Sequence, residues 1–261
     1  MNTQKALITG ASSGIGATYA SRLARRGYDL VLVARDEKRM SALAEKLDAE
    51  TGATVEVIRA DLTVDADIAR IEERLSQDDM TLFINNAGMA LKGGLLDNGP
   101  AELTRLITLN VIAPARLASA AGKRFVACGS GAIINIASVL ALVPEMLDGV
   151  YSGTKAFLLN LSQSMSAQLS AQGVYVQAVL PGATRTEIWE RAGNDINAVP
   201  AEMVMNVDDL VDAALVGFDR RETITIPPLH DDKQFAAMTE ARLAMAPNLS
   251  TSSIAPRYRA A

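Results

Sequence analysis

Short apolar runs alternate with longer amphipathic stretches along most of the chain. The runs are rich in Val, Ile and Leu, which is typical of strands that are buried on both faces of a parallel sheet. These predicted strands cover residues 5–9, 29–34, 54–60, 81–85, 132–138 and 174–180. Between them, helical periodicity predicts helices over about 14–26, 36–50, 65–77, 101–125 and 150–172. This alternation predicts an α/β fold, a doubly wound parallel sheet with helices on both faces.

The pattern loosens beyond residue 181. Residues 183–206 follow a strand and show no clear period, so they are predicted to form a lid over the substrate. The remaining predicted elements are a helix at 207–219, a short strand at 223–227, a helix at 232–245 and a C-terminal tail at 246–261. Because no Gly- or Ser-rich linker interrupts the chain, residues 1–261 are expected to form a single domain.

Composition and charge argue against several classes of function. The 25 Lys and Arg residues stand against 30 Asp and Glu, and no basic run is longer than a pair such as Arg25-Arg26, so a nucleic-acid partner is not expected. One cysteine and one histidine are too few for a metal cluster or a disulfide framework. The cysteine, Cys128, is expected to be a small buried residue rather than a nucleophile. No apolar run approaches the roughly 20 residues of a membrane span and no signal peptide is recognisable, so a cytoplasmic protein without a membrane partner is expected.

Three glycines lie where the first predicted strand runs into the first predicted helix. They are Gly10, Gly14 and Gly16 in the sequence TGASSGIG. Without side chains, the backbone of such a turn allows a pyrophosphate to approach the helix N-terminus. The turn therefore predicts a dinucleotide site. A glycine-rich first turn also occurs in S-adenosylmethionine-dependent transferases, and a tight turn can serve packing alone.

A tyrosine and a lysine are spaced by one helical turn in YSGTK, residues 151–155. Transfer of a hydride to a carbonyl leaves charge on its oxygen, and a nearby side chain must supply a proton. A tyrosine pKa near 10 has to fall by about three units, or roughly 4 kcal/mol, before the phenolate is abundant at neutral pH. The positive charge of Lys155 favours the phenolate of Tyr151. The spacing alone does not distinguish this proton-transfer pair from two surface side chains on one helix face.

Two further polar residues lie at positions that suit a catalytic site. Ser138 ends the fifth predicted strand, at the sheet edge where α/β proteins bind ligands. Asn110 precedes Pro114 by four residues, and proline lacks the N–H that would bond the carbonyl of residue 110. That carbonyl is then available to hold a water molecule. The alternative is an asparagine in an ordinary helix kink.

Taken together, these motifs resemble those of the short-chain dehydrogenase/reductase family over nearly the whole chain. The resemblance rests on the glycine spacing G-x-x-x-G-x-G, on NNAG at 85–88, on PGATRT at 181–186 and on the order of Asn110, Ser138, Tyr151 and Lys155. It implies a Rossmann fold of about seven strands, with Tyr151 as general acid/base, Lys155 on the nicotinamide ribose and Asn110 on a water of the proton relay. The expected cofactor-binding residues are Gly10, Ser12, Ser13, Gly14, Ile15, Gly16, Arg35, Asp61, Leu62, Asn86, Ala87, Gly88, Tyr151, Lys155, Pro181, Gly182, Thr184 and Thr186.

The end of the second predicted strand bears on the choice of cofactor. An acidic residue there would accept from the ribose 2′-hydroxyl and select NAD(H). This chain instead has Ala34 followed by Arg35, whose guanidinium matches the oxygens of a 2′-phosphate. NADP(H) is therefore predicted in preference to NAD(H). The alternative is that Arg35 only caps the strand end or pairs with Asp36 or Glu37.

The predicted function is an NADP-dependent oxidoreductase that acts on a carbonyl or secondary alcohol. Apolar residues within 139–147 favour a hydrophobic small-molecule substrate, whereas Glu145, Asp148 and Arg185 would favour a polar one if they pointed inward. The chain departs from the family pattern at Ala137, where a second serine is common, and it lacks the Asp-Gly-Gly ending typical of bacterial ketoacyl-carrier reductases. A catalytically silent NADP-binding regulator or scaffold is the alternative function.

The resemblance further implies a homodimer or homotetramer. The helix predicted at 150–172 carries Phe157, Leu161, Met165 and Leu169, which resemble the family's subunit interface and are expected to point outward. A second subunit would then cover these apolar side chains.

Overall fold

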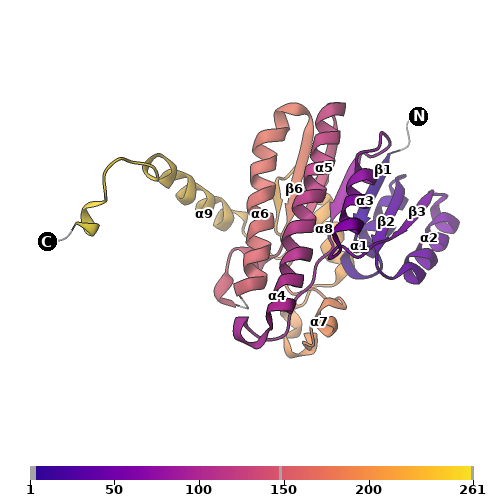
Figure 1. The fold of residues 1–261 in the computed structure, drawn as a ribbon, viewed down its shortest axis with the longest axis horizontal. Helices are drawn as coiled ribbons and strands as arrows, with labels where there is room; N and C mark the ends of the chain where they lie inside the picture. The colour runs from indigo at the N-terminus through magenta and orange to yellow at the C-terminus, as the bar shows by residue number, and fades with distance from the viewer. Residues whose placement is uncertain (1–3, 147–148, 260–261) are drawn as a thin grey trace. The chain divides into compact units, whose positions relative to one another are not determined.

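The sheet expected from the apolar runs is present. The computed structural model describes residues 4–146 and 149–259, and its larger unit, Met1–Pro227, contains a parallel sheet of seven strands in the order β3-β2-β1-β4-β5-β6-β7 (Figure 1). The strands are β1 (Lys5–Thr9), β2 (Asp29–Ala34), β3 (Val55–Arg59), β4 (Leu82–Asn85), β5 (Gly131–Ile136), β6 (Val174–Val179) and β7 (Ile224–Thr225). The doubly wound fold is therefore confirmed. The strand order reverses between β1 and β4, and ligands of such sheets bind outside the carboxyl ends of strands at this point.

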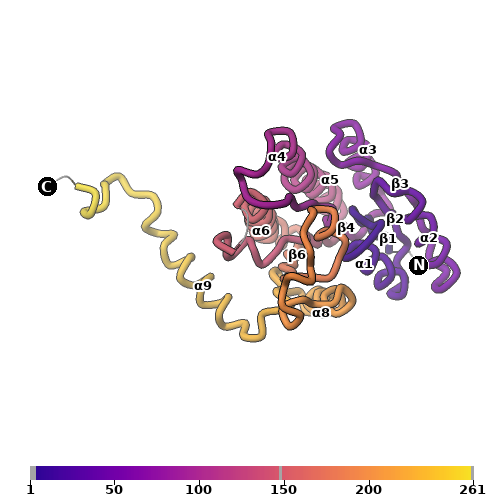
Figure 2. Tube along the Cα trace, turned by 90° about the horizontal axis from the view of Figure 1, so that it is seen from below, coloured from indigo at the N-terminus to yellow at the C-terminus, as the bar shows by residue number. Residues whose placement is uncertain are grey.

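Helices cover both faces of this sheet (Figures 1 and 2). One face is covered by α1 (Gly14–Arg25), α2 (Glu37–Thr51) and α8 (Val207–Asp219), and the other by α3 (Asp65–Leu75), α5 (Ala113–Cys128) and α6 (Gly149–Leu169). Tyr19 and Met40 are fully buried on the first face, and Ile71 and Phe125 on the second. Within the described ranges, no helix is both long enough and apolar enough to cross a membrane. Because both faces of the sheet are buried, its strands read as continuous apolar runs.

The helix expected at 101–125 is interrupted. A π-helix, Thr108–Ile112, joins α4 (Pro100–Ile107) to α5, and the N–H of Ala113 bonds the carbonyl five residues back. Pro114 supplies the physical reason, because it has no N–H with which to continue the ordinary ladder. The expected distortion before Pro114 therefore takes the form of a π-helix.

The end of α5 corrects the expectation for Cys128. This residue is exposed, so it is not the small buried residue that the sequence suggested. Phe125 is the last buried residue of α5, and Cys128 is the last residue of the helix, where residues 127–130 are all exposed as the chain leaves the core. Gly129 then ends the helix in the left-handed region, with φ of +66°.

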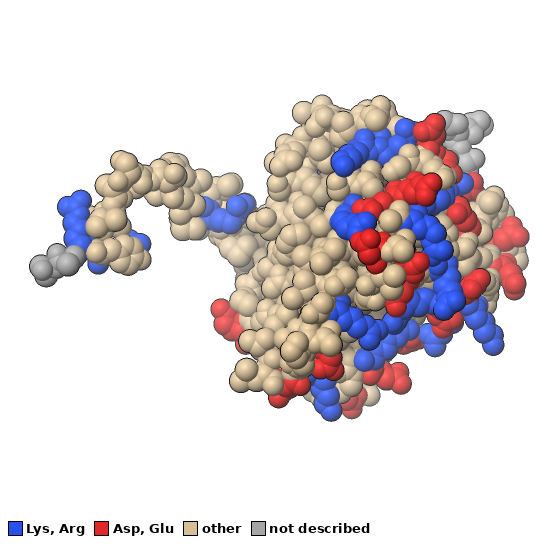
Figure 3. Space-filling model, in the orientation of Figure 1, with Lys and Arg blue, Asp and Glu red and all other residues tan. Residues whose placement is uncertain are grey.

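The apolar side chains of α6 that were expected to point outward do so only in part. Met165 and Leu169 are half-buried, and they pack against the core beside Gly122 of α5, so they point outward only in part. Phe157 is exposed. The one charged residue in α6 is Lys155, and it is buried. The exposed face of α6 therefore carries no charged side chain, and Figure 3 shows that charged side chains gather elsewhere on the molecule.

The turn between β1 and α1 brings backbone segments closer than side chains would allow. Gly10 and Gly14 have φ of +68° and +54°, in the left-handed region. Asn86, directly after β4, donates from Nδ2 to the carbonyl of Thr9 at 2.8 Å and holds β4 against the turn. A Cβ on Gly16 would overlap the carbonyl of Gly10 and would lie 2.6 Å from this Nδ2. Glycine at position 16 is therefore required for α1 to start this close to the sheet.

The segment 183–206 is closed at its base. A parallel bridge joins Thr184 to Met205, and the N–H of Arg185 donates to the carbonyl of Met205 at 3.0 Å. Between these anchors lie α7 (Ile188–Arg191) and two short 3₁₀ turns. The segment is thus an ordered excursion with both ends fixed to each other.

The smaller unit, Pro228–Ala261, contains α9 (Asp232–Met245), which matches the expected final helix. Asp231 caps it by accepting from the N–H of Lys233 at 3.1 Å. No residue of α9 is buried. The helix therefore has no core of its own within this unit.

We expect Gly16→Ala to lower the free energy of unfolding by about 1–3 kcal/mol, because the added methyl group must push α1 away from the carbonyl of Gly10. Urea-induced unfolding followed by circular dichroism measures the change. Gly122→Ala is the matched control. Its Cβ would meet Met165 and Leu169 at 3.5 Å, an ordinary contact, so this substitution within a helix should stabilise the protein by up to about 1 kcal/mol. A Gly16→Ala variant as stable as the wild type would contradict the close approach.

Candidate active site

Tyr151 and Lys155 lie in the first two turns of α6, beside the end of β5. The ammonium group of Lys155 is buried, with 6% of the residue exposed, and it donates to the carbonyl of Ile136 at 2.9 Å. Its Nζ lies 5.8 Å from the centre of the Tyr151 ring, and Tyr151 is half-buried. The two side chains are therefore neighbours at the carboxyl edge of the sheet and not a pair on the protein surface.

Burial sets the protonation of both side chains. It raises the pKa of Tyr151 to about 12 and lowers the pKa of Lys155 to about 8. Burial is the cause of the raised pKa of Tyr151, and the expectation that the charge of Lys155, 5.8 Å from the ring, favours the phenolate stays a prediction. At neutral pH the phenol of Tyr151 therefore keeps its proton and Lys155 is largely charged.

Ser138 lies just beyond β5 and begins a 3₁₀ helix, Val139–Ala141, that packs against α6. Its Oγ accepts from the N–H of Leu140 at 3.1 Å, which orients the hydroxyl group. The N–H of Val139 donates to the carbonyl of Pro181 at 2.9 Å. These bonds hold Ser138, the start of α6 and the Pro-Gly segment after β6 at one edge of the sheet.

Asn110 is buried in the π-helix and binds the backbone of the segment after β4. Its Nδ2 donates to the carbonyl of Met89 at 2.8 Å, and its Oδ1 accepts from the N–H of Met89 at 2.9 Å. A Cβ on Gly88 would lie 3.4 Å from Asn110 Oδ1 and 3.6 Å from Lys155 Nζ. The amide of Asn110 and the ammonium of Lys155 thus flank the same point of the backbone.

Thr154 belongs to this arrangement and was not expected from the sequence. Its Oγ1 accepts from Asn110 Nδ2 at 3.2 Å and donates to the carbonyl of Tyr151 at 2.7 Å. A threonine in a helix commonly bonds a carbonyl in the preceding turn, so the bond from Thr154 to Tyr151 could have been predicted from the local sequence. The contact of Thr154 with Asn110 could not have been predicted in this way, because it depends on the π-helix.

A chain of buried polar groups joins the elements beneath the site. Asn85 Nδ2 donates to Asn135 Oδ1 at 2.9 Å, directly across β4 and β5, and also to the carbonyl of Pro114 at 3.1 Å. Asn135 Nδ2 then donates to Ser162 Oγ at 2.9 Å, and Ser162 donates to the carbonyl of Leu158 at 2.7 Å. The two central strands are therefore tied to both α5 and α6.

The turn between β1 and α1 fits a dinucleotide. Ser13 is the N-cap of α1, yet its side chain makes no capping bond, and the first turn has no acidic residue. The N–H groups at the start of α1 are thus available to an anion. A Cβ on Gly14 would lie 3.2 Å from the Thr186 side chain, so the segment after β6 lies against this turn. The glycines leave space that side chains would fill.

Other residues expected to bind the cofactor lie at the same edge of the sheet. They follow β3 (Asp61, Leu62), β4 (Asn86, Ala87, Gly88) and β6 (Pro181, Gly182, Thr184, Thr186), whereas Ser12, Ser13 and Ile15 flank the glycines. Leu62 is largely taken up by the core, where it packs among buried apolar residues.

Arg35 lies opposite Asp61 at the ends of β2 and β3. Its Nη1 is 3.9 Å from Asp61 Oδ2, and in the part of the chain that is described it forms no ion pair with Asp36 or Glu37. Burial acts to raise the pKa of Asp61, but hydrogen bonds from Thr63 and the charge of Arg35 hold that pKa below its usual value. The Arg35 side chain is 57% exposed, so its guanidinium is accessible to an anionic ligand.

A second arginine, Arg39, links α2 to the segment 183–206. Its Nη1 lies 2.8 Å from both carboxylate oxygens of Glu187, which also accepts from Arg191 at 2.6 Å. This contact could not be predicted from the sequence, because Arg39 and Glu187 are 148 residues apart. Together with the contact between Thr186 and Gly14, it fixes the segment to α2 and to the turn between β1 and α1.

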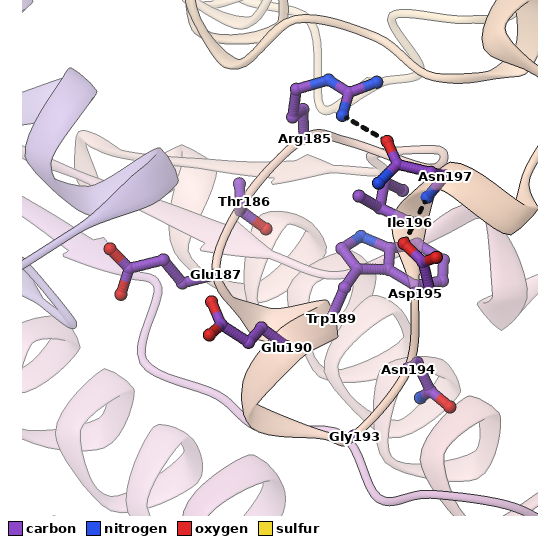
Figure 4. A pocket seen from close by; sticks show the side chains of 10 residues that line it. All are labelled: Arg185, Thr186, Glu187, Trp189, Glu190, Gly193, Asn194, Asp195, Ile196 and Asn197. Carbon is purple, nitrogen blue, oxygen red and sulfur yellow. Dashed lines mark hydrogen bonds between the residues drawn. The ribbon is translucent and has the colours of Figure 1, made fainter.

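A cavity of about 690 Å³ lies within the segment 183–206. Figure 4 shows Arg185 turned toward Asn197, whose Oδ1 accepts from Arg185 Nη1 at 3.2 Å, while Glu187 and Glu190 point away from this pair. The lining residues are Arg185, Thr186, Glu187, Trp189, Glu190, Gly193, Asn194, Asp195, Ile196 and Asn197. Despite these carboxylates, no group of His, Cys, Asp and Glu in the described ranges is arranged to hold a metal ion.

Of the three polar residues that would favour a polar substrate if they pointed inward, the structure describes two. Glu145 is exposed, and Arg185 is engaged with Asn197. Asp148 lies outside the described residues. Val143 and Met146, expected in an apolar wall, are exposed as well. The apolar wall expected from residues 139–147 is therefore partly open to solvent.

The chain is similar to known proteins over most of its length. The family model for short chain dehydrogenases matches residues 4–197. A short-chain dehydrogenase from Sphingobium yanoikuyae, solved in complex with NADPH, is 55% identical over 98% of this chain and 100% of its own, with a TM-score of 0.96. The bulky-bulky ketone specific alcohol dehydrogenase from Comamonas testosteroni is 47% identical, with 99% of each chain covered and a TM-score of 0.91.

A curated relative shares the same core at greater distance. The 17-beta-hydroxysteroid dehydrogenase type 3 from Homo sapiens is 34% identical over 195 residues, which cover 74% of this chain and 63% of the human protein. The order of the motifs, the strand order of the sheet and these similarities agree with one another. The chain belongs to the short-chain dehydrogenase family of oxidoreductases.

Proposed function

We propose that the protein interconverts a ketone and a secondary alcohol with NADP(H), and that Tyr151 is the general acid/base. The observation that carries the proposal is the neighbouring pair of Tyr151 and buried Lys155 at the carboxyl edge of β5. Similarity to a protein in complex with NADPH and to one specific for bulky-bulky ketones supports it. We infer that the substrate is a ketone with large apolar groups on both sides of its carbonyl.

The proposed mechanism assigns one task to each side chain. A bound nicotinamide supplies the hydride that the carbonyl carbon receives. Tyr151 donates its phenolic proton to the carbonyl oxygen, a role that suits a group protonated at neutral pH. Ser138 donates a hydrogen bond to the same oxygen and fixes its position. The charge of Lys155 stabilises the phenolate that remains, and the same groups serve alcohol oxidation in reverse.

The proposed cofactor site uses the open backbone at the start of α1 for the pyrophosphate and Arg35 for the 2′-phosphate. A guanidinium binds a phosphate through charge-assisted hydrogen bonds. Arg35 is free to turn toward such a ligand, because its 3.9 Å approach to Asp61 is longer than a hydrogen bond.

We also propose that residues 183–206 act as a lid. Its base is fixed by the bridge between Thr184 and Met205, and its outer part contacts the nucleotide-binding half through Glu187 and Arg39. The contact is a two-oxygen ion pair at the protein surface, which is weak enough to open and re-form. A lid of this kind would exclude water from the site during hydride transfer.

A catalytically silent NADP-binding regulator or scaffold is the second candidate function. The exposed, uncharged face of α6 favours an interaction role of some kind. Retention of Ser138, Tyr151 and Lys155 disfavours this candidate, because a scaffold needs none of these side chains to react. The expectations from the sequence about location and partners are separate from this choice. A cytoplasmic location, without nucleic-acid or membrane partners, stays a prediction.

Consumption of NADPH over a panel of aromatic and aliphatic ketones tests the main proposal. We expect Tyr151→Phe to lower kcat by at least about 100-fold, because it removes the proton donor. Fluorescence titration should show that Tyr151→Phe still binds NADPH, which assigns the loss of activity to the proton-transfer step. Tyr258→Phe is the control, since Tyr258 is an exposed tyrosine in the smaller unit and should retain full activity. A Tyr151→Phe variant as active as the wild type would refute the mechanism.

Binding of NADPH and NADH to the wild type and to Arg35→Ala tests the cofactor preference. We expect Arg35→Ala to weaken NADPH binding by about 10- to 100-fold, the loss of one or two charge-assisted hydrogen bonds, and to leave NADH binding unchanged. Arg25→Ala, which removes an arginine paired with Glu50 on the surface, should affect neither cofactor. Tighter binding of NADH than of NADPH by the wild type would overturn the preference.

Light scattering tests the expected homodimer or homotetramer. We expect a mass that is a twofold or fourfold multiple of the 27.6 kDa chain, because the exposed face of α6 lacks charge and carries Phe157. Phe157→Glu should shift the mass toward the single chain. A single-chain mass for the wild type at micromolar concentration is the contrary result.

A further inference from the structure

Thr154 joins the two helical segments that carry the candidate catalytic residues. It is 4% exposed, and its hydroxyl group makes two hydrogen bonds. The hydrogen goes to the carbonyl of Tyr151 at 2.7 Å, and the oxygen lies 3.2 Å from Asn110 Nδ2. Because a hydroxyl has one hydrogen, Thr154 must be the acceptor and Asn110 the donor in the second bond. The direction of both bonds is therefore determined.

The amide of Asn110 has three described bonds, and Thr154 makes one of them. The other two go to the N–H and the carbonyl of Met89, in the segment after β4. Three segments therefore meet at one side chain: the segment after β4, the π-helix and the first turns of α6. Thr154 is the member of this junction that belongs to α6.

The first turns of α6 are fixed from two sides. Lys155 bonds the carbonyl of Ile136 at the end of β5, and its neighbour Thr154 bonds the π-helix. Tyr151 lies one turn before both residues. Loss of the Thr154 bond would leave α6 held to β5 but would remove the hydrogen bond that fixes the Asn110 side chain relative to Tyr151.

We propose that Thr154 is a positioning residue for the reaction, whose hydroxyl sets Asn110 relative to Tyr151 and Lys155. The inference rests on the proposed role of Tyr151 as general acid/base. Proton transfer requires donor and acceptor within hydrogen-bond reach, and a misplacement of about 1 Å is enough to slow a reaction about 100-fold. Thr154 touches no reacting atom in this arrangement and acts through Asn110 and the Tyr151 backbone.

Ser152 offers a matched comparison on the same turn. It is 1% exposed, and its hydroxyl has no hydrogen-bond partner among the described residues. Two buried hydroxyl groups thus flank position 153, one bonded to the π-helix and one unbonded. A general effect of buried hydroxyl groups in α6 would appear at both positions, whereas positioning through Asn110 would appear at Thr154 alone.

Steady-state kinetics of Thr154→Val, Thr154→Ser and Ser152→Ala in the full chain test the inference. Valine keeps the shape of threonine without its hydroxyl, and we expect kcat to fall about 10- to 100-fold. The Kd for NADPH, measured by fluorescence without turnover, should stay within about twofold because the cofactor contacts are not touched. Thr154→Ser, which retains the hydroxyl, should recover at least about a third of the wild-type kcat.

The controls separate this inference from the proposed function. Ser152→Ala should keep the wild-type kcat. If Thr154→Val does not fold, Thr154→Ala is measured in its place, with thermal unfolding to establish the folded fraction. A fall in kcat that serine does not rescue, or an equal fall in Ser152→Ala, would overturn the positioning role. If Thr154→Val is fully active while Tyr151→Phe is inactive, the inference fails alone; if Tyr151→Phe is active, the proposed function fails.

Discussion

The site depends on how the protein accommodates one buried ammonium group. A charge removed from water is costly unless hydrogen bonds replace its hydration. Lys155 finds such a bond at the carbonyl of Ile136, where β5 ends. The bond forms only if α6 lies directly beside β5, and the contact between Asn135 and Ser162 holds the same helix and strand together lower down. The position of Tyr151, one turn before Lys155, follows from this constraint.

The segment after β4 connects the glycine turn after β1 to the π-helix that carries Asn110. At one end, Asn86 bonds the carbonyl of Thr9 and so braces the glycine turn. At the other end, Met89 pairs with the amide of Asn110 in the π-helix. A shift of this short segment would therefore disturb both the glycine turn and the π-helix. Its sequence, which begins in the NNAG motif, serves packing between strands as much as contact with a ligand.

The sequence was sufficient for the sheet and for the order of the candidate residues, because both depend on local features. Runs of apolar residues identify strands buried on two faces, and Pro114 identifies the break before α5 for a steric reason. The contacts of Thr154 with Asn110 and of Arg39 with Glu187 depend on how distant elements are rotated against each other. The periodicity of apolar residues within one element does not predict how that element is rotated against the others. The same limit explains Met165 and Leu169, whose direction is set by the packing of α6 on α5.

The two ends of the site are held by interactions of different physical kinds. Asn110 and Thr154 are buried, and their neutral hydrogen bond is shielded from dissolved ions. Arg39 and Glu187 are about half-exposed, and a surface ion pair is screened over a Debye length of about 8 Å at physiological ionic strength. Added salt therefore weakens the ion pair between Arg39 and Glu187 more than the buried hydrogen bond between Asn110 and Thr154. The ionic strength of the solution thus acts on one side of the candidate site and leaves the other side unchanged.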